Sequence, residues 1–393
     1  MKKLIRLTII AVVIATSLGT PAGAHAQSPW PPICQEGSLP SHDPQYPDDQ
    51  LILICIPPNW NGMLAMYAHG YMPEQLPLAL PVTELFLPDG TFVPDMILAQ
   101  GFAFATTSYH KNGYAVEQAR KDLNDLINYF KTLVPHGSLQ KVFLIGASEG
   151  GEIAALMIEH FPNKYNGALA LCGPIGGGTY EVQYLSDFRV LFDYFFPDVF
   201  PFGVTDVPAN AYLNWENYTQ TITWALVSNP AVTTQLYNVS GAATDPANLS
   251  STISTAVSIL FYSIGGTNDM VATAGGMPYD NLTTIYSGSS DDAALNAGVE
   301  RVQSQAKARA YIRRFYQPTG ELQRPLVTLH NTLDPVVPFQ HEQIYTSLAA
   351  GNSSSSFLTV IPVPRYGHCN FTTQEIAGAF TLLVQQASVQ MSP

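Results

Sequence analysis

Short apolar runs alternate with helical patterns along most of this chain, and this alternation constrains the fold more than any other feature. Strands are expected at 51–56, 63–68, 102–107, 142–145, 168–171, 326–330 and 358–361. Helices are expected at 115–133, 148–161 and 373–386, where apolar residues recur every three or four positions. Strands that alternate with helices are typical of βα units around a mostly parallel sheet. We therefore expect an α/β fold.

The alternation is lost between residues 173 and 324. This segment is rich in Tyr and Phe, and its one clear helical pattern, at about 297–316, carries basic residues. Because strand patterns resume after it, we interpret residues 173–324 as a cap inserted into one domain. The core then comprises residues 27–172 and 325–393. The aromatic content of the cap favours a substrate with an apolar or aromatic group.

The N-terminal residues have the pattern of an export signal. Lys2, Lys3 and Arg6 precede an apolar run at 7–18 that is too short to span a bilayer comfortably, and Ala24-His25-Ala26 resembles a cleavage site. We expect a signal peptide at 1–26 and a secreted or periplasmic protein, with an uncleaved anchor as the alternative. No later run is long and apolar enough for stable membrane insertion.

The charge balance argues against nucleic acid as a partner. The chain has 17 basic and 30 acidic residues, a net charge of −13. Removal of residues 1–26 takes away three of the basic residues, which leaves 14 against 30, a net charge of −16. A surface this acidic repels phosphate backbones.

A Gly-x-Ser-x-Gly motif stands between a predicted strand and a predicted helix. It reads Gly146-Ala147-Ser148-Glu149-Gly150. A serine hydroxyl is a poor nucleophile unless a tight turn presents it to a base, and the two glycines permit such a turn. The position between strand and helix makes Ser148 the candidate nucleophile, although an inert serine in a glycine-rich turn would have the same pattern.

Chain order indicates the other two members of a catalytic triad. His368 follows the last predicted strand, and Asp334 follows the strand before it, which completes the order Ser, acid, His. Asp334 would orient the imidazole and stabilise its protonated form. The other histidines considered, namely His69, His110, His330 and His341, are interpreted as structural.

Acyl transfer also needs hydrogen-bond donors for the developing oxyanion. One expected donor is the backbone N–H of Glu149, the residue after the nucleophile. The other is expected in the loop after the strand at 63–68, where His69-Gly70-Tyr71 permits a close backbone turn. We predict that the N–H of Tyr71 is this second donor.

These motifs together resemble those of the α/β-hydrolase fold serine hydrolases, in the esterase, lipase and prolyl-oligopeptidase-like superfamily. The resemblance spans nearly the whole mature chain and implies eight core strands, a cap after the sixth strand and no cofactor or metal. The function expected first is hydrolysis of a small-molecule carboxylic ester through an acyl-enzyme on Ser148. A serine peptidase, acyl transfer to another alcohol and a non-catalytic ligand-binding protein on the same fold remain alternatives.

Four cysteines, an even number in an exported chain, indicate disulfides, and three pairings are possible. Cys172 ends the strand after the nucleophile helix, at the carboxyl edge of the sheet, and Cys369 adjoins His368, which must reach the same edge. We therefore predict a Cys172–Cys369 bond, with free buried thiols as the alternative. A Cys34–Cys55 bond would close a short N-terminal loop.

Overall fold

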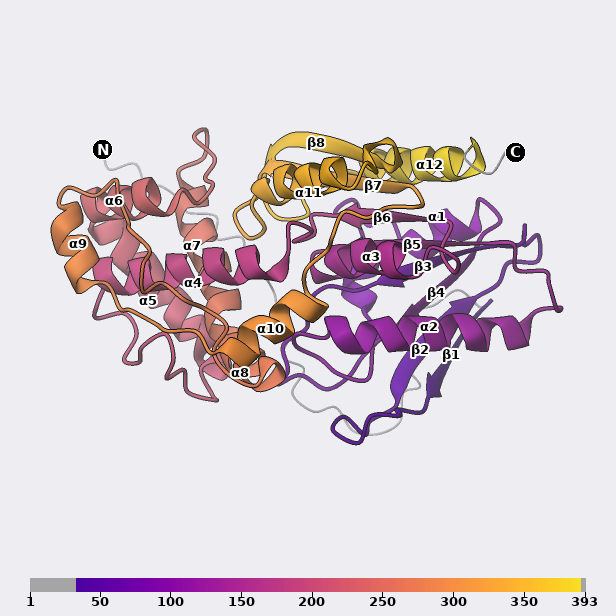
Figure 1. Ribbon diagram of the computed structural model, residues 1–393, viewed down its shortest axis with the longest axis horizontal. Coiled ribbons are helices and arrows are strands. Elements are labelled where there is room, and N and C mark those ends of the chain that lie inside the picture. The colour runs from indigo at the N-terminus through magenta and orange to yellow at the C-terminus, as the bar shows by residue number, and fades with distance from the viewer. Residues whose placement is uncertain (1–32, 390–393) are drawn as a thin grey trace, which may run out of the picture.

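The computed structural model describes residues 33–389, so the predicted signal peptide lies outside the described residues. An eight-stranded sheet forms the centre of the molecule, with strand order β1-β2-β4-β3-β5-β6-β7-β8 (Figure 1). The strands are β1 (Cys34–Leu39), β2 (Gln50–Cys55), β3 (Met63–Ala68), β4 (Ala103–Thr107), β5 (Lys141–Ala147), β6 (Gly167–Leu171), β7 (Leu326–Leu333) and β8 (Leu358–Tyr366).

The sheet is mostly parallel, which confirms the predicted fold class. Strand β2 is antiparallel to both β1 and β4, and the remaining neighbours are parallel. Strands β4 and β6 are buried throughout, as expected for strands covered on both faces. Strand β1 was not predicted, because this edge strand is largely exposed and reads CQEGSL, without an apolar alternation.

Helices cover both faces of the sheet. Helices α2 (Val116–Leu133), α3 (Glu149–His160) and α11 (Gln340–Gly351) contribute to one apolar core. Helices α1 (Val93–Leu98) and α12 (Thr373–Val389) contribute to a second core on the other face. The two cores enclose the parallel strands, so the carboxyl ends of these strands are fixed relative to one another.

The segment between β6 and β7 is helical and forms a lobe beside the sheet (Figure 1). Its helices are α4 (Gly178–Phe195), α5 (Trp215–Ser228), α6 (Pro230–Ser240), α7 (Ser250–Gly265), α8 (Thr267–Ala274), α9 (Asp292–Gly298) and α10 (Ala306–Phe315). The helix predicted at 297–316 is wrong in its first half. Val302 there exchanges hydrogen bonds with Asn281, which holds the connection between α9 and α10 out of a helix.

Most of the cap aromatics fill the interior of the cap itself. Phe188, Phe192, Phe196 and Phe200 are buried in a cluster separate from the two cores of the sheet. Arg189 is 1% exposed within this cluster; its guanidinium binds the Asp193 carboxylate at 2.8 Å and lies 4.4 Å from the centre of the Phe200 ring. These phenyl rings therefore stabilise the cap and are unavailable to a substrate.

Two disulfides are present, and both have the pairing expected from the sequence. Cys34 and Cys55 are opposed on β1 and β2, with their Cα atoms 4.0 Å apart. Cys172 and Cys369, 5.3 Å apart between Cα atoms, join the end of β6 to the loop after β8. Disulfides of this kind persist in oxidising compartments. Among residues 33–389, no helix is long and apolar enough to cross a membrane.

Candidate active site

Ser148 occupies a sharp turn between β5 and α3. Its backbone adopts φ 56° and ψ −125°, a conformation that a residue with a side chain rarely adopts. A Cβ atom on Gly146 would lie 1.9 Å from the carbonyl oxygen of Gly150, and one on Gly150 would lie 2.0 Å from that of Ala68. The turn therefore requires both glycines of the motif, and it raises the Ser148 side chain above the carboxyl edge of the sheet.

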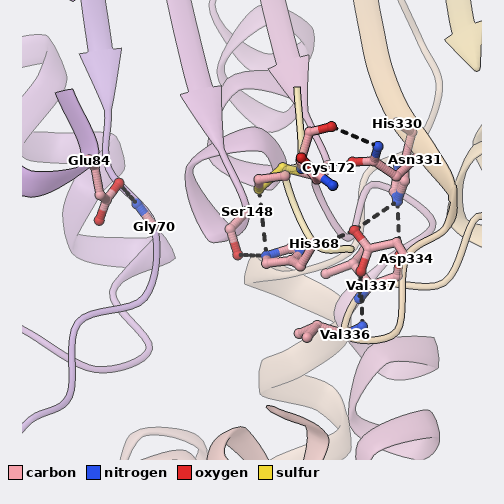
Figure 2. Close-up of a disulfide and its surroundings, with 12 residues drawn as sticks. Gly70, Glu84, Ser148, Cys172, His330, Asn331, Asp334, Val336, Val337 and His368 are labelled. Atoms are coloured by element: carbon pink, nitrogen blue, oxygen red, sulfur yellow. Dashed lines mark hydrogen bonds and ion pairs between the residues drawn. A yellow bond between two sulfur atoms is a disulfide. The ribbon is translucent and has the colours of Figure 1, made fainter. Parts of the chain in front are cut away.

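The structure brings the three residues of the predicted triad together (Figure 2). Nε2 of His368 lies 2.9 Å from Oγ of Ser148, and Nδ1 lies 2.8 Å from Oδ2 of Asp334. Asp334 is 1% exposed, and its other oxygen accepts hydrogen bonds from the N–H groups of Val336 and Val337. This arrangement fixes the tautomer in which Nδ1–H donates to Asp334 and Nε2 accepts the Ser148 hydroxyl proton.

The loop that carries His368 is held at the two residues that follow the histidine. Cys369, the next residue, is bonded to Cys172, and both cysteines have positive φ angles, of 51° and 46°. The Asn331 side chain donates to the carbonyl of Asn370 at 3.0 Å and accepts from its N–H at 2.9 Å. Asn331 was not predicted from the sequence, because its partner lies 39 positions away.

His330 was predicted to be structural, yet it lies beside the triad acid. Its Nε2 is 3.8 Å from Oδ2 of Asp334 and 2.8 Å from the carbonyl oxygen of Val337, while Nδ1 is 3.1 Å from Oε1 of Glu342. Both ring nitrogens thus face acceptors. Burial disfavours the charged imidazolium, but the hydrogen bond and charge of Glu342 and the charge of Asp334 outweigh it and raise the pKa of His330.

The predicted oxyanion loop packs directly against the nucleophile. A Cβ atom on Gly70 would lie 3.3 Å from Cβ of Ser148, and the Gly70 N–H donates to the Glu84 carboxylate at 2.9 Å (Figure 2). Within the described part of the chain, the N–H groups of Tyr71 and Glu149 make no hydrogen bond to protein. Both donors are therefore free for a substrate oxygen, and their role in an oxyanion hole stays a prediction.

Carboxyl groups surround this site. Burial raises the pKa of Glu149 to about 8, and it raises the pKa of Glu181 to about 8 with a further contribution from the charge of Asp334. Glu181, at the start of α4, accepts a hydrogen bond from Nε2 of His341 at 2.8 Å. Burial lowers the pKa of His341 to about 3, so this histidine is neutral and brings no counter-charge.

An aromatic cluster lies where the cap meets the site. The Tyr71 ring contacts the rings of Tyr114 and Tyr262, with centroids 5.2 Å and 5.9 Å apart. Tyr114 from the core and Tyr262 from α7 also line a cavity that continues to Val182 and Met270. The sequence indicated an aromatic cap without showing which of its rings reach the site, and the fold brings Tyr262 there.

The site offers no credible ligand set for a metal ion. Cys172, His368 and Cys369 place their potential ligand atoms within 4.8 Å of one another. However, the two sulfurs are joined in a disulfide, which removes the thiolates that bind metals. The ring nitrogens of His368 are engaged with Ser148 and Asp334. The chemistry of this cluster is therefore that of a nucleophile and its base.

Comparison with known proteins gives short matches to peptidases. No protein-family model matches the chain. It is 33% identical over 114 residues to a lysosomal Pro-X carboxypeptidase of Pongo abelii, over 29% of this chain and 18% of that relative. It is 40% identical over 68 residues to that of Homo sapiens, over 17% of this chain and 14% of the relative. The chain thus matches less than a fifth of each relative.

Solved structures with a similar arrangement include esterases. Feruloyl esterase B from Aspergillus oryzae aligns with a TM-score of 0.48 at 12% identity, over 91% of this chain and 80% of that one. The Pyrococcus furiosus esterase Pf2001 aligns with a TM-score of 0.47 at 10% identity, over 90% and 91% of the two chains.

The fold and the site together define the class of this protein. A mostly parallel eight-stranded sheet, a strained turn at Ser148 between strand and helix, and the chain order Ser148, Asp334, His368 are the features of the α/β-hydrolase fold. The described part of the chain therefore has the α/β-hydrolase fold.

Proposed function

We propose that this protein is a serine hydrolase that cleaves carboxylic esters through an acyl-enzyme on Ser148. The observation that carries the proposal is the continuous hydrogen-bonded series from Ser148 through His368 to Asp334. His368 acts as general base and Asp334 orients its ring. The N–H groups of Tyr71 and Glu149 stabilise the oxyanion.

Each step uses groups that are already in place. Oγ of Ser148 attacks the ester carbonyl carbon while Nε2 of His368 takes the hydroxyl proton, and the carbonyl oxygen becomes an oxyanion. The intermediate collapses, the alkoxide leaves with the proton from Nε2, and an acyl-Ser148 ester remains. Water then attacks this ester, gives its proton to Nε2, and a second collapse returns the proton to Ser148 and releases the carboxylic acid.

The charges near the site favour a neutral ester. The phenol of Tyr262 has its pKa raised to about 12, first by burial and then by the negative charges of Glu84, Asp334 and Glu181. A substrate anion next to the scissile bond would experience the negative charges of Glu84 and Asp334 and be repelled, and Glu181 would add to this repulsion once the pH exceeds its raised pKa of about 8. Lys111, a cation at the boundary between cap and core, is paired with Asp269 at 2.8 Å. These observations support ester cleavage over removal of a residue that bears a free carboxylate.

Export of the mature protein is part of the proposal. The basic, apolar and small-residue pattern of residues 1–26 supports a cleaved signal peptide, and the two disulfides are compatible with an oxidising compartment. The proposed substrate is a small ester with an apolar or aromatic group, which the Tyr71, Tyr114 and Tyr262 rings would contact.

A serine peptidase is the second candidate. It is favoured by the matches to proteins named lysosomal Pro-X carboxypeptidase, at 33% and 40% identity over short regions. The same triad chemistry would apply, with an amine in place of the alcohol as leaving group. The carboxylates around Ser148 would have to be offset by a cationic group of the peptide.

The test is a substrate panel applied to the wild-type protein and its Ser148→Ala variant. The panel contains p-nitrophenyl esters of acetate, butyrate, octanoate and benzoate, and p-nitroanilides of matched acyl groups and of single amino acids. We expect esters to be hydrolysed faster than amides. Ser148→Ala should lower turnover by several orders of magnitude and up to about a million-fold. Ser347→Ala, in an exposed position of α11, serves as the matched control.

The outcomes separate the candidates. Faster cleavage of amino-acid nitroanilides than of matched esters would establish the peptidase alternative. A folded wild-type protein that neither hydrolyses the panel nor reacts with a fluorophosphonate at Ser148 would favour a non-catalytic binding protein. An equally active Ser148→Ala variant would refute the assignment of the nucleophile.

A further inference from the structure

A second concave surface lies at the far end of the nucleophile helix. This groove is bounded by α2, the C-terminal end of α3 and the C-terminal end of α10, and has a volume of about 450 Å³. Ligand pockets commonly have volumes of about 300–1,000 Å³. Since α3 has 12 residues, the groove begins about 18 Å from Ser148 along the helix axis. The groove is thus separate from the candidate active site.

The groove is basic in a protein whose net charge is −13. Arg120 and Lys121 from α2 and Arg314 from α10 line it, together with the rings of Phe161 and Phe315. The ammonium of Lys164 lies 5.3 Å from the centre of the Phe161 ring. The guanidinium carbon of Arg314 lies 5.0 Å from the centre of the Phe315 ring. Cations and apolar faces therefore alternate along the groove.

The two arginines of the groove lack partners. Within residues 33–389, the guanidinium groups of Arg120 and Arg314 donate no hydrogen bond and form no ion pair, and neither does the ammonium of Lys121. Arginines elsewhere in the fold do have acceptors, namely Arg189, Arg301, Arg309, Arg324 and Arg365. The arginines without an acceptor, within the described residues, are thus concentrated at the groove and beside it.

An acid at the groove does not neutralise it. Glu117 lines the groove, but its Oε2 accepts a hydrogen bond from the Tyr311 hydroxyl at 2.8 Å and makes no ion pair with Arg120. Burial lowers the pKa of Arg120, Glu117 opposes this effect, and the positive charge of Arg314 adds to it. Arg120 is partly buried and Arg314 is exposed, so the repulsion between the two charges acts mainly on Arg120, and an anion between them would offset it.

We propose that this groove binds a ligand with a carboxylate or phosphate group attached to an apolar or aromatic portion. The anionic group would lie between Arg120 and Arg314, because the planar guanidinium matches the two oxygens of a carboxylate or phosphate. The apolar portion would pack on Phe161 and Phe315. Carboxylates and phosphates share this recognition chemistry, and the experiment below distinguishes them.

Isothermal titration of the full protein at low ionic strength tests the proposal. The probes are benzoate, phenyl phosphate and inorganic phosphate, with benzyl alcohol as the uncharged analogue. We expect saturable binding of at least one aryl anion and none of benzyl alcohol. Stronger binding of phenyl phosphate than of benzoate identifies phosphate as the preferred group, and the reverse order identifies carboxylate.

The variants are Arg120→Gln and Arg314→Gln, with Arg313→Gln as the matched control. Arg313 carries the same charge on the same helix but does not line the groove. We expect each groove variant to weaken binding about tenfold or more, because a charge-assisted hydrogen-bond pair is lost. Arg313→Gln should change affinity by less than about threefold, through general electrostatics alone.

Thermal unfolding without ligand provides the second measurement. If the arginines serve a ligand, Arg120→Gln relieves repulsion and the melting temperature stays the same or rises. If Arg120 were structural, the melting temperature would fall. The proposal is overturned by a fall in the melting temperature, by the absence of saturable binding at concentrations up to about 10 mM, the weak end of specific affinity, or by equal effects of Arg313→Gln and Arg314→Gln.

Discussion

Sγ of Cys369 lies 3.6 Å from Nε2 of His368, and this sulfur is bonded to Cys172 at the end of β6. The residue next to the candidate base is therefore covalently joined to the central sheet. Displacement of the His368 backbone away from Ser148 requires movement of a loop that the disulfide restrains. The bond couples the stability of the fold to the geometry of the site.

Replacing both cysteines of this bond by alanine should reduce activity as well as stability. The bond closes a span of 197 residues, for which loop-closure entropy gives a loss of at most about 4–5 kcal/mol in the free energy of unfolding. A freed His368 loop should lower kcat/KM about a hundredfold, since small misplacements of catalytic groups are costly. Urea unfolding and ester hydrolysis measure the two effects separately.

The Cys34→Ala, Cys55→Ala double variant is the matched control. Its disulfide spans 21 residues at the edge of the sheet, far along the strand order from β7 and β8. It should lose about 3 kcal/mol of stability at most and retain its kcat/KM under conditions where it is folded. Equal losses of activity in the two double variants would show that the Cys172–Cys369 bond does not position His368.

The sequence was sufficient for the parts of the site that depend on local pattern or chain order. Ser148 was found because two glycines and the flanking strand and helix patterns are contiguous, and Asp334 and His368 because each follows a strand. Asn331 and His330 could not be assigned in this way. Their contacts to Asn370 and Glu342 arise from the packing of the loop after β8 and of helix α11 against β7, which no local pattern specifies.

The cap was the least predictable part of the fold. Its extent followed from the loss of the strand pattern, but its aromatics could not be divided between interior and site. Phe196 and Tyr262 are both aromatic residues in helical surroundings, yet the first is buried in the cap and the second contacts Tyr71. Which face of each helix points to the sheet depends on how the cap helices pack on one another, a property of the tertiary structure.

Replacing His330 by glutamine should remove the loss of folding stability that accompanies a rise in pH above about 6.5. The folded protein raises the pKa of His330 above its ordinary value of 6.5. The resulting stabilisation is fully present below about pH 6.5 and is lost as the pH rises through the raised pKa. In His330→Gln this loss should disappear, whereas His136→Gln, at an exposed position, should behave like the wild-type protein.

The same variant tests whether His330 acts on the base as a positioning residue. A protonated His330 lies 3.8 Å from the carboxylate that binds His368 and disfavours a second positive charge there. Its removal should move the acidic limb of the kcat/KM profile to higher pH. An unchanged acidic limb, with altered stability alone, would assign His330 a purely structural role.

Glu149→Gln should make the protein more stable at mildly alkaline pH. Burial raises the pKa of Glu149 from 4.5 to about 8, so the unfolded chain ionises first as the pH increases. Stability therefore falls between about pH 4.5 and pH 8, and it is restored as the pH is lowered through this range. Glutamine keeps the oxygen that accepts the Ala115 N–H at 2.9 Å but cannot ionise.

Urea unfolding at about pH 5 and about pH 8 measures this effect. The difference between the two pH values should shrink by an amount on the order of a few kcal/mol in Glu149→Gln. Glu36→Gln, at an exposed position of β1, provides a control for the loss of a surface charge. The assignment is refuted if the two variants show the same pH dependence.

Tyr262→Ala should change the acyl preference of the enzyme. The ring contacts Tyr71 in the predicted oxyanion loop and lines the cavity between cap and core. Its removal should enlarge the space available to a substrate and raise the ratio of kcat/KM for octanoate over acetate esters about tenfold, since a methylene in an apolar pocket is worth about 1–3 kcal/mol. Ester hydrolysis across chain lengths measures this ratio.

Phe196→Ala separates substrate selection from stability of the cap. Phe196 is 6% exposed within the interior of the cap, so its truncation should cost about 3–5 kcal/mol of stability while the ratio of octanoate to acetate hydrolysis stays unchanged in the folded protein. Tyr262→Phe should retain the wild-type ratio, because the ring and its apolar contacts remain. If Tyr262→Ala left the ratio unchanged and Phe196→Ala altered it, acyl selection would reside in the α4 region and the cavity beside Tyr71 would have no part in it.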